Sequence, residues 1–224
     1  ANQFLDDRQR VYIQLATTPK EAVAKAISAV RRTLFVVATH GNEPIGVNVL
    51  KQLEQEKIIT GNSWIIGNPK ALEKGLRYTE DDLNRVFPGA NSGGSYEKRR
   101  AAEIMDNLGK YRYVVDIHGT DDDVGIFIIL SNSTVENVAL AERFDVSRVV
   151  FWPSTRGLAF GSLNQFARCG IEIECGPQRN EKIQQELKQV LTRYLLGLKA
   201  SRPKLYFKVY GKLEQYRGLQ EFKS

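Results

Sequence analysis

Histidine and cysteine are both scarce in this chain, with two residues of each among 224. Cys169 and Cys175 would lie about 20 Å apart if the segment between them is extended, whereas a disulfide requires Cα atoms within about 7 Å. We therefore expect two free thiols, which are typical of a reducing cytoplasm. Two cysteines are also too few for a structural zinc site built on cysteine.

Long apolar runs are absent as well. No stretch reaches the roughly 18 apolar residues of a membrane-spanning helix. The first ten residues are polar and charged, which is unlike a secretory signal, and the chain does not begin with Met, so the natural start can differ from this one. We expect a cytoplasmic protein without a membrane partner.

The net charge of +6 is concentrated after Gln178, where 11 lysine and arginine residues outnumber 4 acidic ones. These charges are spaced singly along a predicted helix and strand, so we interpret them as a solvated face and expect no nucleic-acid partner. The composition, 42% hydrophobic and 26% charged, is that of an ordinary globular domain with a sizeable core.

Hydrophobic runs rich in β-branched residues alternate with segments of helical periodicity. The predicted strands are Val11–Leu15, Leu34–Thr39, Ser63–Gly67, Tyr113–Ile117, Gly125–Leu130, Arg148–Trp152, Gly170–Cys175 and Leu205–Tyr210. The predicted helices are Val23–Val30, Pro44–Gln55, Tyr96–Leu108, Val135–Arg143 and Ile183–Leu198. This alternation predicts a three-layer α/β/α fold with a central mixed, largely parallel sheet.

Both histidines directly follow an apolar strand, His40 in LFVVATH and His118 in YVVDIH. Functional sites of α/β sheets lie at the carboxyl ends of strands. Glu43 follows His40 by three residues, and imidazole nitrogen and carboxylate oxygen both bind zinc at about 2.0–2.2 Å. The three residues therefore predict a His₂Glu zinc site with an open fourth position. The alternative is that both are ordinary core or surface histidines.

Three carboxylates lie near these strand ends. Asp116 faces the same way as His118, two residues along the strand, and either orients that ligand or is an ordinary strand-end acid. Glu172 and Glu174 share one face of a strand that is otherwise fit for burial, where ionised carboxylates are costly unless paired or functional. Glu174, nearer the strand end, is the better candidate for a general acid/base, and Glu172 for a supporting or salt-bridging residue.

The segment from Arg77 to Arg85, RYTEDDLNR, is dense in charge. By itself it would be interpreted as a solvated loop with local ion pairs. A zinc hydrolase of acyl amino acids, however, must stabilise an oxyanion and grip a carboxylate, and arginine suits both tasks. Arg77 and Arg85 could divide them.

Five motifs occur in one order: HGNE, NPKAL, RYTEDDLNR, DIHGT and IECGPQ. Between Leu34 and Gln178 the chain thereby resembles the succinylglutamate desuccinylase/aspartoacylase family, a branch of the zinc-carboxypeptidase-like hydrolases. The resemblance implies one Zn²⁺ per chain and hydrolysis of the amide bond of a small N-acyl amino acid. The zinc ligands that it implies are His40, Glu43 and His118.

The same resemblance implies roles for the polar residues around the metal. Glu174 matches the general acid/base and Arg77 the residue that polarises the scissile carbonyl. Asn84 and Arg85 match the pair that holds the substrate's α-carboxylate, and Asp82 a residue that supports this loop.

The chain departs from the family pattern at three places. Gly119 stands where aspartoacylases have Asn, and Asn164 stands where they carry an Arg that grips the aspartate side chain. Asn164 is therefore the expected substrate contact at that position, for an acylated amino acid other than acetylaspartate. Members also usually have a C-terminal β-rich domain, most of which this chain lacks. We expect a catalytic domain over residues 1–200, with the last strand and a shortened C-terminal segment over 201–224.

Two other functions remain open at this stage. A zinc carboxypeptidase acting on peptides would use the same clamp, and a zinc-binding scaffold without turnover would keep the same fold. The sequence names neither the acyl group nor the amino acid, and it leaves a homo-oligomer open.

Overall fold

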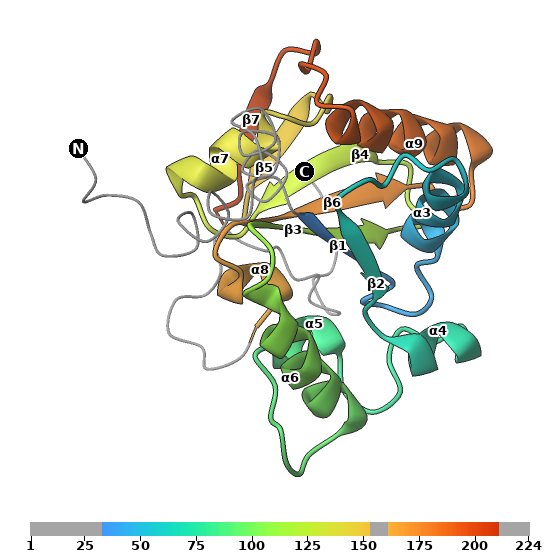
Figure 1. The fold of residues 1–224 in the computed structure, drawn as a ribbon, viewed down its shortest axis with the longest axis vertical. Helices are drawn as coiled ribbons and strands as arrows, with labels where there is room; N and C mark the ends of the chain where they lie inside the picture. Colours follow the sequence, from blue (N-terminus) through green and yellow to red (C-terminus); the bar gives the residue numbers. More distant parts are fainter. Residues whose placement is uncertain (1–32, 153–160, 211–224) are drawn as a thin grey trace, which may run out of the picture.

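The computed structural model describes residues 33–152 and 161–210, which form a seven-stranded sheet with helices on both faces (Figure 1). The strands are β1 (Thr33–Val37), β2 (Ser63–Ile66), β3 (Tyr113–Gly119), β4 (Gly125–Leu130), β5 (Arg148–Phe151), β6 (Gly170–Gly176) and β7 (Leu205–Lys208). The helices are α3 (Ile45–Gln55), α4 (Pro69–Lys74), α5 (Leu83–Val86), α6 (Tyr96–Leu108), α7 (Val135–Ala141), α8 (Leu163–Phe166) and α9 (Glu181–Leu195). The predicted three-layer architecture is confirmed.

The strand order is β2-β1-β3-β6-β4-β5-β7. All neighbours run parallel except β6 and β4, which are antiparallel, so the sheet is mixed and largely parallel as predicted. β1, β3 and β6 are adjacent and parallel, and their carboxyl ends therefore meet at one edge of the sheet. This edge carries the side chains at or just beyond the carboxyl end of each of the three strands.

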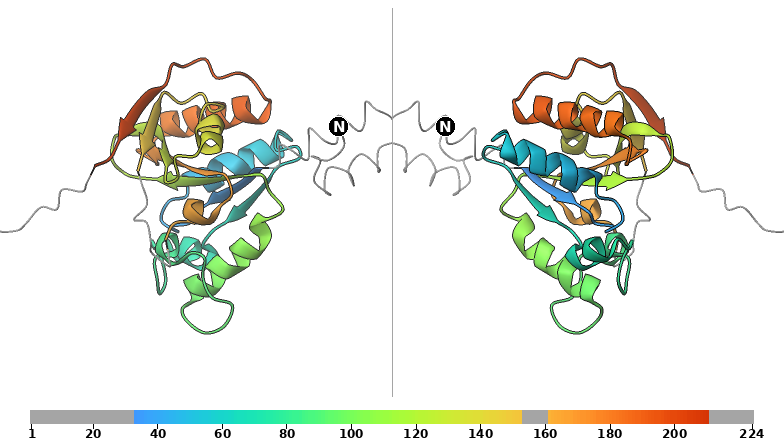
Figure 2. Two further views of the ribbon diagram at one scale, coloured as in Figure 1. Left: turned by 90° about the vertical axis from the view of Figure 1, so that its left-hand side faces the viewer. Right: turned by 90° about the vertical axis from the view of Figure 1, so that its right-hand side faces the viewer.

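Side chains of the central strands alternate between two cores. Phe35 and Val37 of β1 pack with residues of α3, α7 and α9, whereas Leu34 and Val36 pack with residues of α5, α6 and α8. Figure 2 shows α3 and α9 on one side of the sheet and α6 on the other. On β3, Val114 belongs to the second core, so Asp116 and His118 face the side of α5, α6 and α8.

Most predicted elements match the observed ones to within three residues at each end. The predicted strand Val11–Leu15 and helix Val23–Val30 lie outside the described residues. The sequence did not predict α4, α5 and α8, because helices of 6, 4 and 4 residues are too short to display a periodic apolar face. Local capping defines α4 instead: the Asn68 side chain accepts a hydrogen bond from the Ala71 N–H.

Two further expectations can be compared with the fold. Cys169 and Cys175 are free and buried, as predicted. None of the helices in the described part of the chain has the length and apolar character that a membrane crossing requires.

β7 pairs in parallel with β5, so the residues just after Ala200 still contribute a strand to the same sheet.

Candidate metal centre

The turn between β1 and α3 carries two of the three predicted metal ligands. Ala38 has a φ of 51°, a left-handed conformation that turns the chain out of the strand. A Cβ added at Gly41 would lie 2.1 Å from the Ala71 carbonyl carbon, so this turn packs directly on the backbone of α4. The turn leaves His40 and Glu43 buried at the carboxyl edge of the sheet, with 3% and 6% of their surfaces exposed.

The carboxylate of Glu43 lies between the two histidine rings. Its Oε1 is 2.8 Å from His40 Nδ1, and its Oε2 is 3.0 Å from His118 Nδ1. The Gly119 N–H also donates to Oε2 at 3.1 Å. One ligand atom from each of the three residues lies within 4.8 Å of the others. The structure thus brings together the three residues that the sequence singled out.

Each histidine contacts a further carboxylate through its other ring nitrogen. His40 Nε2 is 3.0 Å from Asp82 Oδ1, and His118 Nε2 is 3.1 Å from Asp116 Oδ2. Asp116 is itself held by the Thr39 hydroxyl, which donates to Oδ1 at 2.8 Å. His40 Nε2 thus faces a hydrogen-bond partner and His118 Nε2 lies at ion-pair distance from Asp116, while both Nδ1 atoms are turned toward Glu43. Carboxylates commonly orient metal-binding histidines in this way.

The contact between Asp82 and His40 is the part that sequence reasoning missed. The sequence placed Asp82 only as a supporting residue of its own loop, because 42 residues separate it from His40. No spacing rule connects residues so far apart. Asp116 differs, since its two-residue offset from His118 on a strand indicated a common face.

The charges of the cluster are strongly coupled. Burial would lower the pKa of His40, but hydrogen bonds with Asp82 and Glu43 raise it above its ordinary value. Burial also opposes protonation of His118, but Asp116 and Glu43 raise its pKa well above the ordinary value. Burial would raise the pKa of Glu43, but hydrogen bonds from the two rings hold it well below its usual range.

Two buried nitrogens and a carboxylate at this spacing are the donor set of a divalent transition metal, zinc above all. The residues therefore fit such an ion, and its binding at Nδ1 would displace any proton on that nitrogen of each ring.

Glu172 and Glu174 extend the polar side of the sheet onto β6. The strand register pairs Asp116 with Glu172 and His118 with Glu174. Glu174 is thus next to the cluster, and Glu172 is one pair deeper, where the Ser131 hydroxyl donates to it at 3.3 Å. Burial raises the pKa of both glutamates, and the nearby His118 only partly opposes this.

The loop from Arg77 to Arg85 approaches the same cluster from the solvent side. Arg77 Nη1 is 3.4 Å from Glu43 Oε1, and its Nη2 is 3.4 Å from Asp82 Oδ2, with 45% of the side chain exposed. Asn84 is buried, and its Oδ1 has no hydrogen-bond partner among the described residues. Arg85 is exposed and donates to the Asn84 carbonyl at 2.9 Å.

The structure does not bring Asn164 to the cluster. Its side chain, 1% exposed, packs against Gly170, where an added Cβ would lie 2.3 Å from its Oδ1. Gly170 begins β6 and precedes Glu174 by four residues, which corresponds to about 13 Å along a strand. Asn164 therefore lies beside the middle of β6, where its side chain partly offsets the rise that burial causes in the pKa of Glu172, and its contact with substrate stays a prediction.

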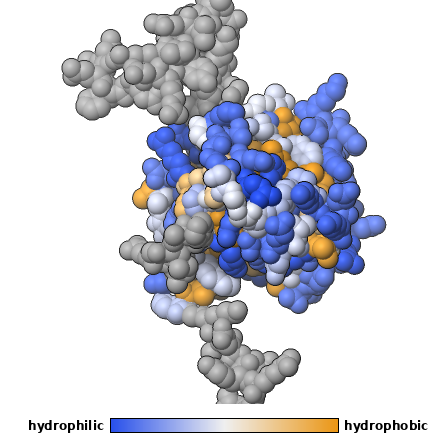
Figure 3. Space-filling view, turned by 90° about the horizontal axis from the view of Figure 1, so that it is seen from below, coloured by the Kyte–Doolittle hydropathy of each residue, from blue (hydrophilic) through white to orange (hydrophobic). Residues whose placement is uncertain are grey.

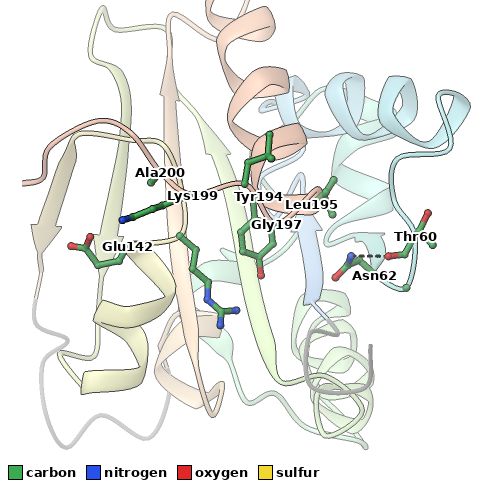
Figure 4. Close-up of a pocket in the computed structure, with 11 residues that line it drawn as sticks. Thr60, Asn62, Glu142, Tyr194, Leu195, Gly197, Lys199 and Ala200 are labelled. Carbon is green, nitrogen blue, oxygen red and sulfur yellow. Dashed lines mark hydrogen bonds between the residues drawn. The ribbon is translucent and has the colours of Figure 1, made fainter. Parts of the chain in front are cut away.

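A separate pocket of about 340 Å³ lies at the other ends of the strands (Figure 4). Asn62, which immediately precedes β2, and Tyr194 of α9 are among its lining residues. The Asn62 amide donates to the Thr60 carbonyl at 3.1 Å and its oxygen accepts from the Thr33 N–H. This pocket contains none of the predicted site residues.

Comparison with known proteins relates the chain to a group of hydrolases. Residues 29–200 match the family model described as succinylglutamate desuccinylase/aspartoacylase catalytic domain. A probable aspartoacylase of Acaryochloris marina (strain MBIC 11017) is 30% identical over 166 residues, which are 66% of this chain and 56% of the relative. A probable aspartoacylase of Nostoc sp. (strain PCC 7120 / SAG 25.82 / UTEX 2576) is 38% identical over 120 residues, 47% of this chain and 41% of the relative. The chain spans about half the length of these relatives.

Solved structures share the fold. Murine aminoacylase 3 superimposes with a TM-score of 0.64 at 23% identity, covering 74% of this chain and 63% of that one. Succinylglutamate desuccinylase from Vibrio parahaemolyticus also gives a TM-score of 0.64, at 14% identity, covering 84% of this chain and 73% of that one.

Proposed function

Since the chain belongs to the succinylglutamate desuccinylase/aspartoacylase catalytic domain family, we propose that it is a zinc-dependent hydrolase that cleaves the amide bond of a small N-acyl amino acid. The observation that carries this proposal is the cluster of His40, Glu43 and His118, buried beside Glu174 at the carboxyl edge of the sheet. Family membership supplies the class of reaction, and the cluster supplies the metal site that it requires.

His40, Glu43 and His118 would hold one zinc ion per chain. A zinc ion with an open coordination position supplies Lewis acidity, which activates water at neutral pH and polarises a carbonyl. Asp82 and Asp116 keep the two imidazoles turned toward the metal position through their Nε2 atoms. Arg77 lies on the solvent side of this position, 3.4 Å from Glu43 Oε1 and 3.4 Å from Asp82 Oδ2.

Glu174 performs the proton transfers in this proposal. Its carboxylate takes a proton from the attacking water, and the resulting acid returns it to the leaving amine as the C–N bond breaks. Its raised pKa, caused by burial, suits a group that must hold the proton between these two events.

The loop residues provide binding and charge stabilisation. The Arg77 guanidinium, partly exposed above Glu43, donates to the carbonyl oxygen as negative charge develops on it. The side-chain NH₂ group of the buried Asn84 and the exposed Arg85 guanidinium hold the α-carboxylate by donating hydrogen bonds to its oxygens.

The test is an assay of the zinc-loaded protein against N-acetyl and N-succinyl amino acids, with release of free amine as the readout. We expect hydrolysis that rises with added zinc to one equivalent per chain and is abolished by chelation. Hydrolysis of peptides without hydrolysis of acyl amino acids would identify a carboxypeptidase instead. Stoichiometric zinc without turnover on either class would identify a scaffold.

A further inference from the structure

The loop that carries the proposed substrate contacts is shaped by one buried carboxylate. Residues 78–82 belong to no helix or strand, so no ladder of backbone hydrogen bonds fixes them. At one end the Arg77 carbonyl accepts from the Gly41 N–H at 3.1 Å, and at the other Asp82 caps α5 and contacts His40. The middle of the loop needs a separate anchor.

Glu97, in the first turn of α6, provides that anchor. Its Oε1 accepts from the Thr79 N–H at 2.7 Å and from the Thr79 hydroxyl at 2.6 Å. Its Oε2 accepts from the N–H groups of Glu80 and Asp81, each at 3.2 Å. Three successive N–H groups thus converge on one carboxylate, which is the geometry in which backbone binds an anion.

A fifth hydrogen bond connects the Glu97 carboxylate, through Asn68, to the turn that carries the candidate ligand His40. The Asn68 side-chain amide donates to Glu97 Oε1 at 3.1 Å, while the Asn68 N–H donates to the Ala38 carbonyl at 2.9 Å. Ala38 begins the turn that carries His40. Through Glu97 and Asn68, one hydrogen-bond network holds both the loop of residues 78–82 and the turn that carries His40.

Glu97 is unlike the other acids of α6. It is fully buried, whereas Glu103 is exposed and pairs with Arg100 one turn away. The face of the molecule on the side of α4, α5 and α6 is mainly hydrophilic, with hydrophobic residues in separate small patches (Figure 3), but the buried Glu97 is not part of this surface. The helix start does not require Glu97, because the Ser95 hydroxyl already caps it by accepting from the Lys98 N–H. A buried charge is costly unless it is paired, and here all its partners but Asn68 belong to the loop.

We propose that Glu97 is a positioning residue of the active site. Its carboxylate folds the backbone of residues 79–81 around itself and thereby places Arg77, Asp82 and the Asn84–Arg85 pair beside the three candidate metal ligands. The kinetic part of this inference rests on the proposed function. The structural part, the fixed conformation of the loop, does not.

The test compares Glu97→Gln with the matched control Glu103→Gln on the same helix. Glutamine keeps the shape of Glu97 but replaces one acceptor oxygen by an NH₂ group that opposes the loop N–H groups. By hydrogen exchange, we expect the amides of residues 79–81 to lose protection by about tenfold or more in Glu97→Gln, with the strands unchanged. Glu103→Gln should exchange like the wild type.

Kinetics of the zinc-loaded proteins provide the second readout. We expect kcat/KM of Glu97→Gln to fall by about 10- to 100-fold, the usual effect of losing a group that supports metal ligands. A loss of folded protein alone lowers kcat and leaves KM unchanged. Displacement of Asn84 and Arg85 also raises KM, and it does so for N-acyl amino acids but not for their α-carboxamides, which lack the carboxylate.

The outcomes separate the two proposals. Wild-type protection and wild-type kinetics in Glu97→Gln would overturn the positioning role. Lost protection at residues 79–81, in a protein whose wild type hydrolyses no acyl amino acid, would support the anchor and refute the proposed function. Should Glu97→Gln fail to fold, Thr79→Ala removes only the hydroxyl donor and should lower both protection and kcat/KM several-fold, with recovery in Thr79→Ser. No effect of Thr79→Ala would count against the anchor.

Discussion

His118 Nδ1 lies 3.0 Å from Glu43 Oε2, although 75 residues separate the two in the chain. The parallel pairing of β1 with β3 produces this contact, because it brings the turn after one strand beside the end of the other. Glu43 also accepts a hydrogen bond from the Gly119 N–H, so its carboxylate joins β3 to the β1–α3 turn.

The first prediction concerns the ligand set. His118→Ala removes one of three ligands, and the protein should no longer retain stoichiometric zinc after dialysis against a chelator concentration that the wild type withstands. Zinc content by atomic spectrometry measures this. Asp121→Asn, a change of an exposed side chain near the same strand end, should retain wild-type zinc. One zinc per chain in His118→Ala would rule out the proposed ligands.

The second prediction concerns Asp82. Asn at this position keeps the oxygen that caps α5 but removes the negative charge beside His40 Nε2. Zinc affinity should fall by about 10- to 100-fold, as is usual when a carboxylate behind a ligand histidine is lost. Competition with a chromophoric chelator measures the affinity.

The neighbouring carboxylate offers a matched control for this change. Asp81→Asn alters a partly exposed side chain that pairs at 3.7 Å with Lys98, and it should leave zinc affinity within about twofold of wild type, as expected of an exposed ion pair. Equal affinities in the two variants would show that Asp82 does not act on His40.

The third prediction separates the two glutamates of β6. Glu174→Gln should lower kcat by about 10²- to 10⁴-fold and keep one zinc per chain, because general acid/base catalysis contributes on that scale. Glu172→Gln, one register pair deeper, should have a much smaller effect on kcat. Steady-state assays on the best N-acyl amino acid measure both. Undiminished hydrolysis by Glu174→Gln would remove its assignment as acid/base.

Much of the fold could be predicted from sequence because most strands are marked by short apolar runs. Apolar runs such as Leu34–Val37 and Ile126–Leu130 require burial on both faces, and their alternation with helical periodicity admits few architectures. The cluster of candidate metal ligands was predictable for a related reason. With only His40 and His118 in the chain, each at a strand end, parallel pairing of their strands was enough to join them.

The rest of the site depends on contacts that no local pattern encodes. Glu97 looks like an ordinary acid in the first turn of a helix, where negative charge is common, and only its burial reveals the loop folded around it. Asn164 is a second example. The family resemblance implied a substrate contact at its position, and in the structure α8 packs its side chain against Gly170 and beside Glu172, so that contact stays a prediction.

The fourth prediction is a pH dependence of stability. Burial would raise the pKa of Glu97, but hydrogen bonds from Thr79, Asn68 and the Asp81 N–H lower it to about 2 from an ordinary 4.5. Because the folded-state pKa lies below the unfolded one, the ionised carboxylate stabilises the fold fully above pH 4.5, and this contribution is lost as pH falls toward about 2. It amounts to something on the order of 3 kcal/mol.

Urea unfolding of metal-free wild type and Glu97→Gln between pH 7 and 3 measures this dependence. The two share all other titrating groups, so the difference in their free energies of unfolding isolates Glu97. That difference should shrink as pH falls below about 4.5. The difference between wild type and Glu103→Gln should stay within about 0.5 kcal/mol throughout, as for most surface changes. A pH-independent difference for Glu97→Gln would contradict the lowered pKa.

The fifth prediction tests how closely the metal-binding turn must approach α4. An alanine Cβ at Gly41 would lie 2.1 Å from the Ala71 carbonyl carbon and 2.2 Å from the Leu72 nitrogen, both backbone atoms that cannot rotate away. Gly41→Ala should therefore lower the free energy of unfolding by about 2 kcal/mol or more and weaken zinc binding, because relieving the clash moves His40 and Glu43. Gly109→Ala is the matched control, since nothing lies within 4 Å of its added Cβ and its φ of −59° suits alanine. The Gly109→Ala change should be neutral or slightly stabilising. A Gly41→Ala protein with wild-type stability and wild-type zinc affinity would mean that the turn can shift without cost to the site.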